Sequence, residues 1–442
     1  MALKLKRTLS LFEATFYGVG IIVGAGIYAL LGEATNVAGN AVWISFLIGA
    51  AISAFTGLSY AELSAMYPKA AAEYVYIKKA YASKFLAFMI GWLIIFTGVV
   101  SVATVALGFS GYFASIVKNF YPMSIPDNTF TISAATILII ALSYISFLGI
   151  KESSRVNIVT TGIEIAGLVI IILLGLGSYG SVNYFEMPHG FSGVLVASTL
   201  VFFAYIGFED IANISEETKN PKKVLPRALM FAIVITAILY LLTSISAISL
   251  VNWQELGKST NPLALVASKK LGSGAYFLLS FIALFATSST VLIILIVVAR
   301  MMYGMADHHA LPHKLASIHH KRRTPWIASL VVMSLSIIFV LGGKIETVAS
   351  ITSLGAFITF ITVNLSLIWL RFTHPKIPRP FKVPLNIGRF PILPFLGSIF
   401  SVFMIFQFEW NIVIVGIAIL IVGAAVYYLR KNKIIPIKEI NE

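Results

Sequence analysis

Twelve apolar stretches divide this chain, and most of them are long enough to cross a lipid bilayer. A spanning helix needs about 20 apolar residues at a rise of about 1.5 Å per residue. Backbone groups inside lipid must be hydrogen-bonded within the segment, which favours helices over open strands. The stretches are residues 11–32, 41–65, 85–114, 131–149, 156–178, 193–213, 228–251, 275–304, 326–342, 345–370, 393–407 and 409–429. The sequence therefore predicts an all-α membrane protein with about 12 transmembrane helices.

Charged residues are scarce, which excludes an ordinary soluble protein. Only 11% of the residues are charged and 58% are apolar, whereas soluble domains carry about 25% charged residues. No linker or change in composition divides the chain, so we expect a single polytopic membrane domain over residues 1–442, surrounded by the lipid bilayer. The first apolar stretch is too long for a signal peptide and is interpreted as an uncleaved first helix. The absence of cysteine excludes disulfides and thiolate chemistry.

The positive charges are distributed unevenly between the loops. An even number of spans places both chain ends on one side, where 27 of the 32 Lys and Arg residues lie. The other five are Lys118, Lys258, Lys269, Lys270 and Lys344. Because Lys and Arg accumulate in cytoplasmic loops, we expect a cell (inner) membrane protein with both termini in the cytoplasm. This topology explains the formal charge of +14 without a nucleic-acid partner.

Two of the predicted spans contain helix-breaking residues deep in the membrane. The break in the first span lies about 20 Å from one face, and the break in the sixth lies about 16 Å from the other. The residues concerned are Val23, Gly24, Ala25 and Gly26 in the first span and Phe203, Ala204, Tyr205, Ile206 and Gly207 in the sixth. The pattern predicts a five-plus-five inverted repeat with discontinuous helices one and six. The repeats are residues 11–178 and 193–370, followed by two additional helices over 393–429.

Glycine in membrane helices also serves close helix packing, which is the alternative interpretation of the first break. Gly20 and Gly24 have the four-residue spacing that such packing favours. Matching breaks in two spans point instead to a binding site, because unwound backbone at membrane depth is tolerated where it lines a cavity. Freed N–H groups at such breaks attract an anionic group, and freed carbonyls attract a cation.

Five stretches in this order resemble the amino acid, polyamine and organocation (APC) superfamily of transporters. They are residues 18–28 (GVGIIVGAGIY), 62–80 (ELSAMYPKAAAEYVYIKKA), 202–210 (FFAYIGFED), 216–228 (EETKNPKKVLPRA) and 299–312 (ARMMYGMADHHALP). The resemblance covers nearly the whole chain. It implies a secondary active transporter of amino acids, which is not an enzyme and needs no cofactor.

The resemblance also implies roles for the residues at the two breaks. The backbone of Gly24, Ala25 and Gly26 would receive the substrate carboxylate, and the carbonyls from Ala204 to Gly207 would receive its ammonium group. Phe203 would close over the substrate from the outer side. The side chains expected to line the rest of the pocket are Ile27, Phe203, Phe208 and Ile294. Because none of them is acidic, we expect neutral amino acids to be preferred.

The fifth span departs from the family pattern at Glu164, where many relatives place a lysine. Placing a carboxylate in the middle of a span costs about 2.5 to 3.5 kcal/mol on insertion scales. Because of this cost, a carboxylate at such a position is expected to have a function. Glu164 is either a proton carrier or a ligand, with Ser288 or Ser289, of a cation such as sodium. The alternative is a protonated core residue that is hydrogen-bonded to a neighbour. Two further departures, Ala71-Ala72 and His308-His309, lie outside the predicted pocket.

Other functions use similar features and stay open. A membrane nutrient sensor, or an exchanger of cationic amino acids or polyamines, would use the same site. An ion channel is disfavoured because the sequence has no pore motif or ring of charges. Five histidines between His308 and His320 are interpreted as a solvated loop rather than a metal site. The particular amino acid, the direction of transport and the oligomeric state are not predicted.

Overall fold

The computed structural model describes residues 5–120, 127–259, 261–341 and 345–430. Residues 1–4, 121–126, 260, 342–344 and 431–442 lie outside these ranges. The cytoplasmic placement of the two chain ends concerns residues outside the described ranges and stays a prediction. Lys344 and the last three lysines of the chain also lie there, and nothing is described of the side chain of Lys118.

The described chain is built almost entirely of helices, as predicted. Ten helical segments are long and apolar enough to cross a membrane, and two shorter apolar helices accompany them in the described ranges. In chain order the segments are α1 (Leu11–Val23) with α2 (Ala25–Ala38), α3 (Val42–Met66), α5 (Lys84–Phe120), α6 (Asp127–Leu148), α7 (Ile150–Gly175), α8 (Gly190–Phe202) with the 3₁₀ helix η4 (Phe208–Glu217), α9 (Pro221–Leu250), α12 (Ser273–Asp307), α13 (Trp326–Val340), α14 (Ile345–Thr373), α15 (Ile392–Ile405) and α16 (Trp410–Arg430). An all-α membrane protein with about 12 helices is thus confirmed.

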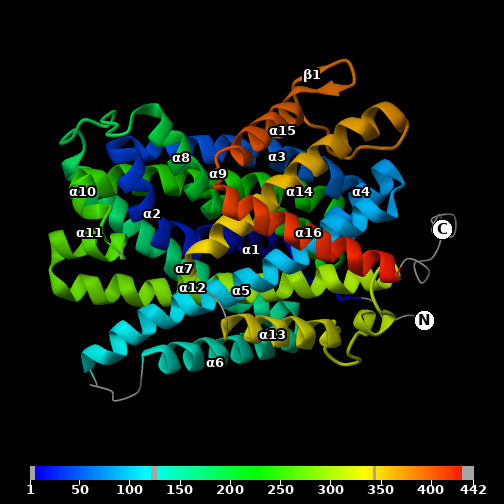
Figure 1. The fold of residues 1–442 in the computed structure, drawn as a ribbon, viewed down its shortest axis with the longest axis horizontal. Helices are drawn as coiled ribbons and strands as arrows, with labels where there is room; N and C mark the ends of the chain where they lie inside the picture. The colour runs from blue at the N-terminus through cyan, green and yellow to red at the C-terminus, as the bar shows by residue number, and fades with distance from the viewer. Residues whose placement is uncertain (1–4, 121–126, 260, 342–344, 431–442) are drawn as a thin grey trace.

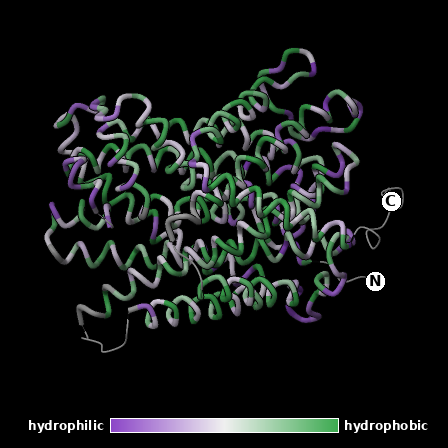
Figure 2. The backbone as a smooth tube through the Cα atoms, viewed as in Figure 1, coloured by the Kyte–Doolittle hydropathy of each residue, from purple (hydrophilic) through white to green (hydrophobic). Residues whose placement is uncertain are grey.

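The long helices lie side by side along the longest dimension of the molecule (Figure 1). Figure 2 shows hydrophobic residues along most of their length and hydrophilic residues mainly at the two ends of the bundle. The sides of the bundle are strongly apolar as well. Ile137, Val159, Ile338 and Ile421 are each more than 60% exposed on the outward faces of four different helices. A surface of this kind is stable against lipid rather than water.

Short elements connect the spanning helices. Helix α4 (Ala72–Tyr81) follows α3, and α10 (Trp253–Leu256) and α11 (Pro262–Leu271) lie between α9 and α12. Helix α11, which is ten residues long, is not among the segments long enough to span a membrane. The remaining elements are the single turns η1 (Gly39–Ala41), η2 (Leu176–Ser178), η3 (Phe203–Tyr205) and η5 (His313–Ala316) and a hairpin of β1 (Asn386–Ile387) and β2 (Phe390–Pro391).

A buried ion pair fixes the end of η4 against α12. The guanidinium of Arg300 donates to both carboxylate oxygens of Glu217, each at 3.0 Å, and both side chains are buried. The segment before α1 is joined to the same place, because Leu9 donates its N–H to the Glu217 carbonyl and accepts from Lys219. The two ends of this buried pair satisfy each other, as buried charges must. The first and sixth spanning segments are therefore anchored together at one end of the bundle.

Candidate functional site

The first spanning segment is interrupted at Gly24, where α1 ends and α2 begins. The N–H of Ala25, freed by the interruption, donates to the Thr290 hydroxyl of α12 at 3.1 Å. A side chain at Gly24 would overlap that hydroxyl, and a Cβ at Gly26 would lie 2.5 Å from the Ala204 Cα. Glycine is therefore required at Gly26 by a neighbouring backbone, whereas a side chain at Gly24 would have to displace the Thr290 side chain.

The sixth spanning segment is interrupted at Ile206 and Gly207. Helix α8 runs into η3, Ile206 is extended, and Gly207 has a φ of +119°, a conformation that favours glycine. The N–H of Gly207 donates to the Glu209 carboxylate at 2.9 Å, which satisfies one group freed by the break. Both breaks thus lie where the sequence places them.

Tyr240 of α9 connects the two breaks. Its hydroxyl contacts the carbonyl oxygen of Ile22 at the end of α1, and it lies 2.9 Å from the carbonyl oxygen of Ala204. A hydroxyl has one hydrogen, so it can donate to only one of these carbonyls at a time. The ring is held in place by Phe46 and Tyr205, with centroids 5.6 Å and 5.1 Å away. A buried tyrosine therefore joins the end of α1 to Ala204, whose carbonyl is one of those expected to bind the substrate.

Sequence reasoning missed both Tyr240 and Thr290. Each is a polar residue in an otherwise apolar span, and a polar side chain at that depth needs a partner. That signal was present in the sequence, but it does not say which backbone group the partner is.

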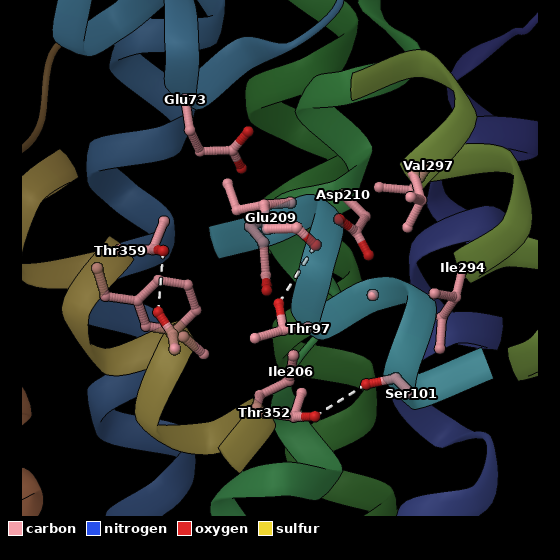
Figure 3. Close-up of a pocket in the computed structure, with 16 residues that line it drawn as sticks. Glu73, Thr97, Ser101, Ile206, Glu209, Asp210, Ile294, Val297, Thr352 and Thr359 are labelled. Carbon is pink, nitrogen blue, oxygen red and sulfur yellow. Dashed lines mark hydrogen bonds between the residues drawn. The ribbon is translucent and has the colours of Figure 1, made fainter. Parts of the chain in front are cut away.

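A cavity of about 80 Å³ lies beside the second break (Figure 3). Ile206 and Ile294 line it together with residues of α5 and α14, so two of the predicted pocket residues meet there. Ile27 and Phe208 are fully buried instead, and Phe208 packs edge-on against Tyr60. The other residues of the breaks, Val23 to Gly26 and Ala204, Tyr205 and Gly207, do not line this cavity. The two breaks are packed directly against each other.

Three carboxylates line the same cavity, which differs from the expected pocket without acidic groups. Glu73 comes from α4, and Glu209 and Asp210 come from η4. Figure 3 shows them gathered at one end of the cavity, while Ser101 and Thr352, whose hydroxyls are 2.9 Å apart, lie at the other. The sequence, with its spans treated as regular α-helices, did not predict this arrangement. The turn at Gly207 and the 3₁₀ winding of η4 change the direction of the Glu209 and Asp210 side chains, and Glu73 comes from a connecting helix.

The carboxylate of Glu73 is positioned by Asn213 of η4. The Asn213 amide donates to Glu73 Oε2 at 3.2 Å, and its oxygen accepts from the N–H of Ala72 at 2.9 Å. Burial raises the pKa of Glu73 from about 4.5 to about 7. Desolvation disfavours the charged carboxylate more than these contacts favour it. Glu73 therefore titrates near neutral pH.

Glu73→Gln is expected to remove a pH dependence of stability. In the folded protein Glu73 keeps its proton up to about pH 7, whereas in the unfolded chain it loses the proton near pH 4.5. Stability is therefore lost as the pH rises from about 4.5 to about 7, by an amount on the order of 3 kcal/mol. We expect the melting temperature of the parent to fall between about pH 5 and about pH 8, and that of the variant to fall less. Parallel curves for the two proteins would contradict this assignment.

A second cavity, of about 400 Å³, includes Phe203 of η3 in its wall. Leu30 of α2 and Ser353 of α14 line it as well. The two cavities have no lining residue in common. The neighbouring ring of Phe202 is buried and stacks on Phe357 of α14 with centroids 4.2 Å apart. Phe203 thus lines a cavity other than the one that Ile206 and Ile294 line, and its role in closing over a substrate stays a prediction.

Glu164 of α7 is completely buried, and neither of its carboxylate oxygens has a hydrogen-bond partner among the described residues. Ser289 lies beside it, but the Ser289 hydroxyl donates to Asn157 at 3.0 Å. The Ser288 hydroxyl donates to the Leu284 carbonyl of its own helix at 2.6 Å. Of the two predicted serines, Ser289 is the one that lies beside Glu164, and the Ser288 hydroxyl is engaged within its own helix.

Two broken helices that pack together and leave polar backbone groups deep in the bundle are the architecture of a membrane carrier. The family model described as amino acid permease matches residues 9–419. The chain belongs to the amino acid permease family, within the APC superfamily.

Characterised relatives have names that agree with this family. The chain is 30% identical to the branched-chain amino acid permease BcaP of Bacillus subtilis, over 97% of this chain and 94% of BcaP. It is 30% identical to the methylthioribose transporter of the same organism, with the same coverage. It is also 30% identical to cationic amino acid transporter 4 of Mus musculus, over 86% of this chain and 62% of the relative.

Proposed function

We propose that this protein is a secondary active transporter that carries amino acids across the cell membrane, with both termini in the cytoplasm. The observation that carries this proposal is the pair of breaks at Gly24 and Gly207. An amino acid backbone is a fixed pair of an anion and a cation, which the N–H groups at the start of α2 and the carbonyls of the second break would match. The contact between the breaks, at Gly26 and Ala204, corresponds to a closed site that opens when the substrate enters.

We propose a preference for neutral amino acids. Ile206 and Ile294 provide an apolar wall for a substrate side chain. The branched-chain permease among the relatives is consistent with such a wall.

The carboxylates of Glu73, Glu209 and Asp210 favour a second candidate, the transport of cationic amino acids or polyamines. A lysine or arginine side chain that extended past Ile206 would meet negative charge there. Cationic amino acid transporters are also among the relatives. The two candidates differ in the charge that the cavity accepts at its acidic end.

A competition experiment separates these candidates. Purified protein is incubated with a labelled ligand and a panel of amino acids, and binding is read by scintillation or thermal shift. We expect alanine, leucine and phenylalanine to compete and arginine and diamines to compete weakly, because an apolar wall gains nothing from a charged side chain. Strong competition by arginine, lost in Asp210→Asn, would instead establish the cationic candidate.

We propose that transport is coupled to protons through Glu164. A buried carboxylate without a partner is compatible with its apolar surroundings only in the neutral form. Ionisation of Glu164 would therefore favour a different conformation, in which the site opens to the other side of the membrane. Sodium held by Glu164 and Ser289 is the alternative coupling, and exchange without an ion is a third. A nutrient sensor that binds without transporting is distinguished by uptake into proteoliposomes, since a sensor binds the amino acid without accumulating it.

A further inference from the structure

A third cavity, of about 390 Å³, lies away from the substrate site, at the end of α14 and in the loop that leads to α15. Its lining residues are Arg371, Pro375, Ile377, Arg379, Lys382 and Arg389. Four of these six side chains are positively charged. A cavity with this lining suits an anion rather than an amino acid.

The inner wall of this cavity is held together by buried ion pairs. Glu62 of α3 is completely buried and accepts from the guanidinium of Arg371, at 3.1 Å to Nε, and from that of Arg379, at 3.0 Å. It also accepts from the N–H of Val383 at 2.8 Å. One carboxylate therefore faces two guanidinium groups. Adding Lys382, Arg389 and this carboxylate gives four positive charges and one negative charge, a net charge of +3.

The outer rim of the cavity is free to bind. Lys382 and Arg389 are exposed, and neither forms an ion pair within the described part of the chain. Arg389 follows Gly388, whose φ of +60° forms the turn of the β1–β2 hairpin. The hairpin thus presents a cation at its tip beside the fixed guanidinium groups. Cations converging from two sides are the arrangement that binds phosphate oxygens.

The hairpin also carries apolar side chains that have no protein surface to cover. Leu385 is 64% exposed and Ile387 is 72% exposed. Trp369 and Phe372, in the last turns of α14, are about half exposed and mark the level at which aromatic residues meet the membrane surface. Figure 1 shows the hairpin projecting sideways from the bundle, next to α15, rather than away from it along the helices. This position would lay the hairpin on lipid headgroups beside the protein.

We propose that this cavity binds the phosphate headgroup of an anionic phospholipid, with Leu385 and Ile387 entering the boundary with the acyl chains. A dissolved phosphate ion would use the cations but would gain nothing from the apolar hairpin, whereas a lipid uses both. The expected topology places this end of the bundle at the cytoplasmic leaflet, which is rich in anionic lipids. Lipid bound there joins α3, α14 and α15 at their common end.

The test compares lipid binding by full-length variants, measured by native mass spectrometry of purified protein titrated with phosphatidylglycerol or phosphatidylcholine. The double variant Lys382→Gln/Arg389→Gln removes two rim charges from exposed positions. We expect affinity for phosphatidylglycerol to fall about fivefold for each charge, which corresponds to about 1 kcal/mol each, and about 30-fold in total. Phosphatidylcholine binding should not change.

The matched control is Lys321→Gln/Arg322→Gln, which removes the same charge from another basic cavity at the loop before α13. Equal losses in the control and the test variant would show that general charge attraction is responsible and would overturn the proposal. Unchanged phosphatidylglycerol binding in the test variant would overturn it as well.

A third variant, Leu385→Ser/Ile387→Ser, distinguishes a lipid from a free anion. We expect it to weaken phosphatidylglycerol binding, and we expect inorganic phosphate to displace the lipid poorly from the parent. Efficient displacement by phosphate, together with full lipid binding by this variant, would identify a site for a free anion and reject the lipid. Melting curves in phosphatidylcholine confirm that each variant is folded.

Discussion

Gly26→Val is expected to abolish substrate binding while leaving the protein in the membrane. The new Cβ would lie 2.5 Å from the Cα of Ala204, a backbone atom that cannot rotate away. The two breaks would be forced apart, and the substrate carboxylate would lose its approach to the backbone. We expect the dissociation constant to rise at least about 100-fold, equivalent to about 3 kcal/mol, because overpacking of this kind costs about 1–3 kcal/mol or more. Equilibrium binding on purified protein measures the change.

The matched control is Gly108→Val in α5, where an added Cβ would meet no atom within 4 Å. This variant should bind like the parent. Gly24→Val should have a smaller effect than Gly26→Val, because it meets the side chain of Thr290, which can rotate. If Gly26→Val binds substrate with the affinity of the parent, the breaks are packing features and the proposed carboxylate site is wrong.

Glu164→Gln is expected to keep substrate binding and to lose the stimulation of uptake by an inward proton gradient. The amide resembles the neutral carboxylic acid, which is the form that the buried and unpartnered position accepts. Coupling depends on a difference between the protonated and ionised forms of Glu164, and a glutamine side chain cannot release a proton to produce the second form. Uptake into proteoliposomes, with and without a pH gradient and with and without sodium, measures the effect.

Glu152→Gln serves as the control, since Glu152 lies in the first turn of the same helix and outside its buried middle. A sodium requirement that disappears in Glu164→Gln would support sodium coupling instead of proton coupling. Transport like that of the parent, with the same dependence on pH and sodium, would leave Glu164 as a core residue. Glu209, which lines the cavity beside the second break, would then be tested next.

The fold and the breaks could be predicted because each leaves a local mark in the sequence. Membrane spans show as long apolar stretches, and unwound backbone at membrane depth shows as Gly24 in one span and Gly207 in another. Tyr240 and Thr290 could not be assigned in the same way. Their roles depend on which carbonyl or amide of a distant span they reach, and hydrophobic patterning does not contain that information.

The three carboxylates that line the cavity could not be predicted from the sequence, for a related reason. Glu73 belongs to a connecting helix outside the spans, and only the fold carries it to the cavity. Asp210 lies near the predicted end of the sixth span, and the 3₁₀ winding after Gly207 places it in the lining of the cavity. The expectation of a pocket without acidic groups failed because it considered only residues of the spans at and opposite the breaks, such as Ile27 and Ile294.

Uptake of a labelled amino acid into proteoliposomes that contain the purified protein tests the central proposal most directly. The amino acid is one that competes in the binding panel, and Gly26→Val provides the inactive reference. The proposal predicts that the parent accumulates the amino acid inside the vesicles, above the level reached with Gly26→Val, and that an inward proton gradient increases the accumulation. Binding of the same amino acid without accumulation under any gradient would contradict transport and would identify the protein as a sensor.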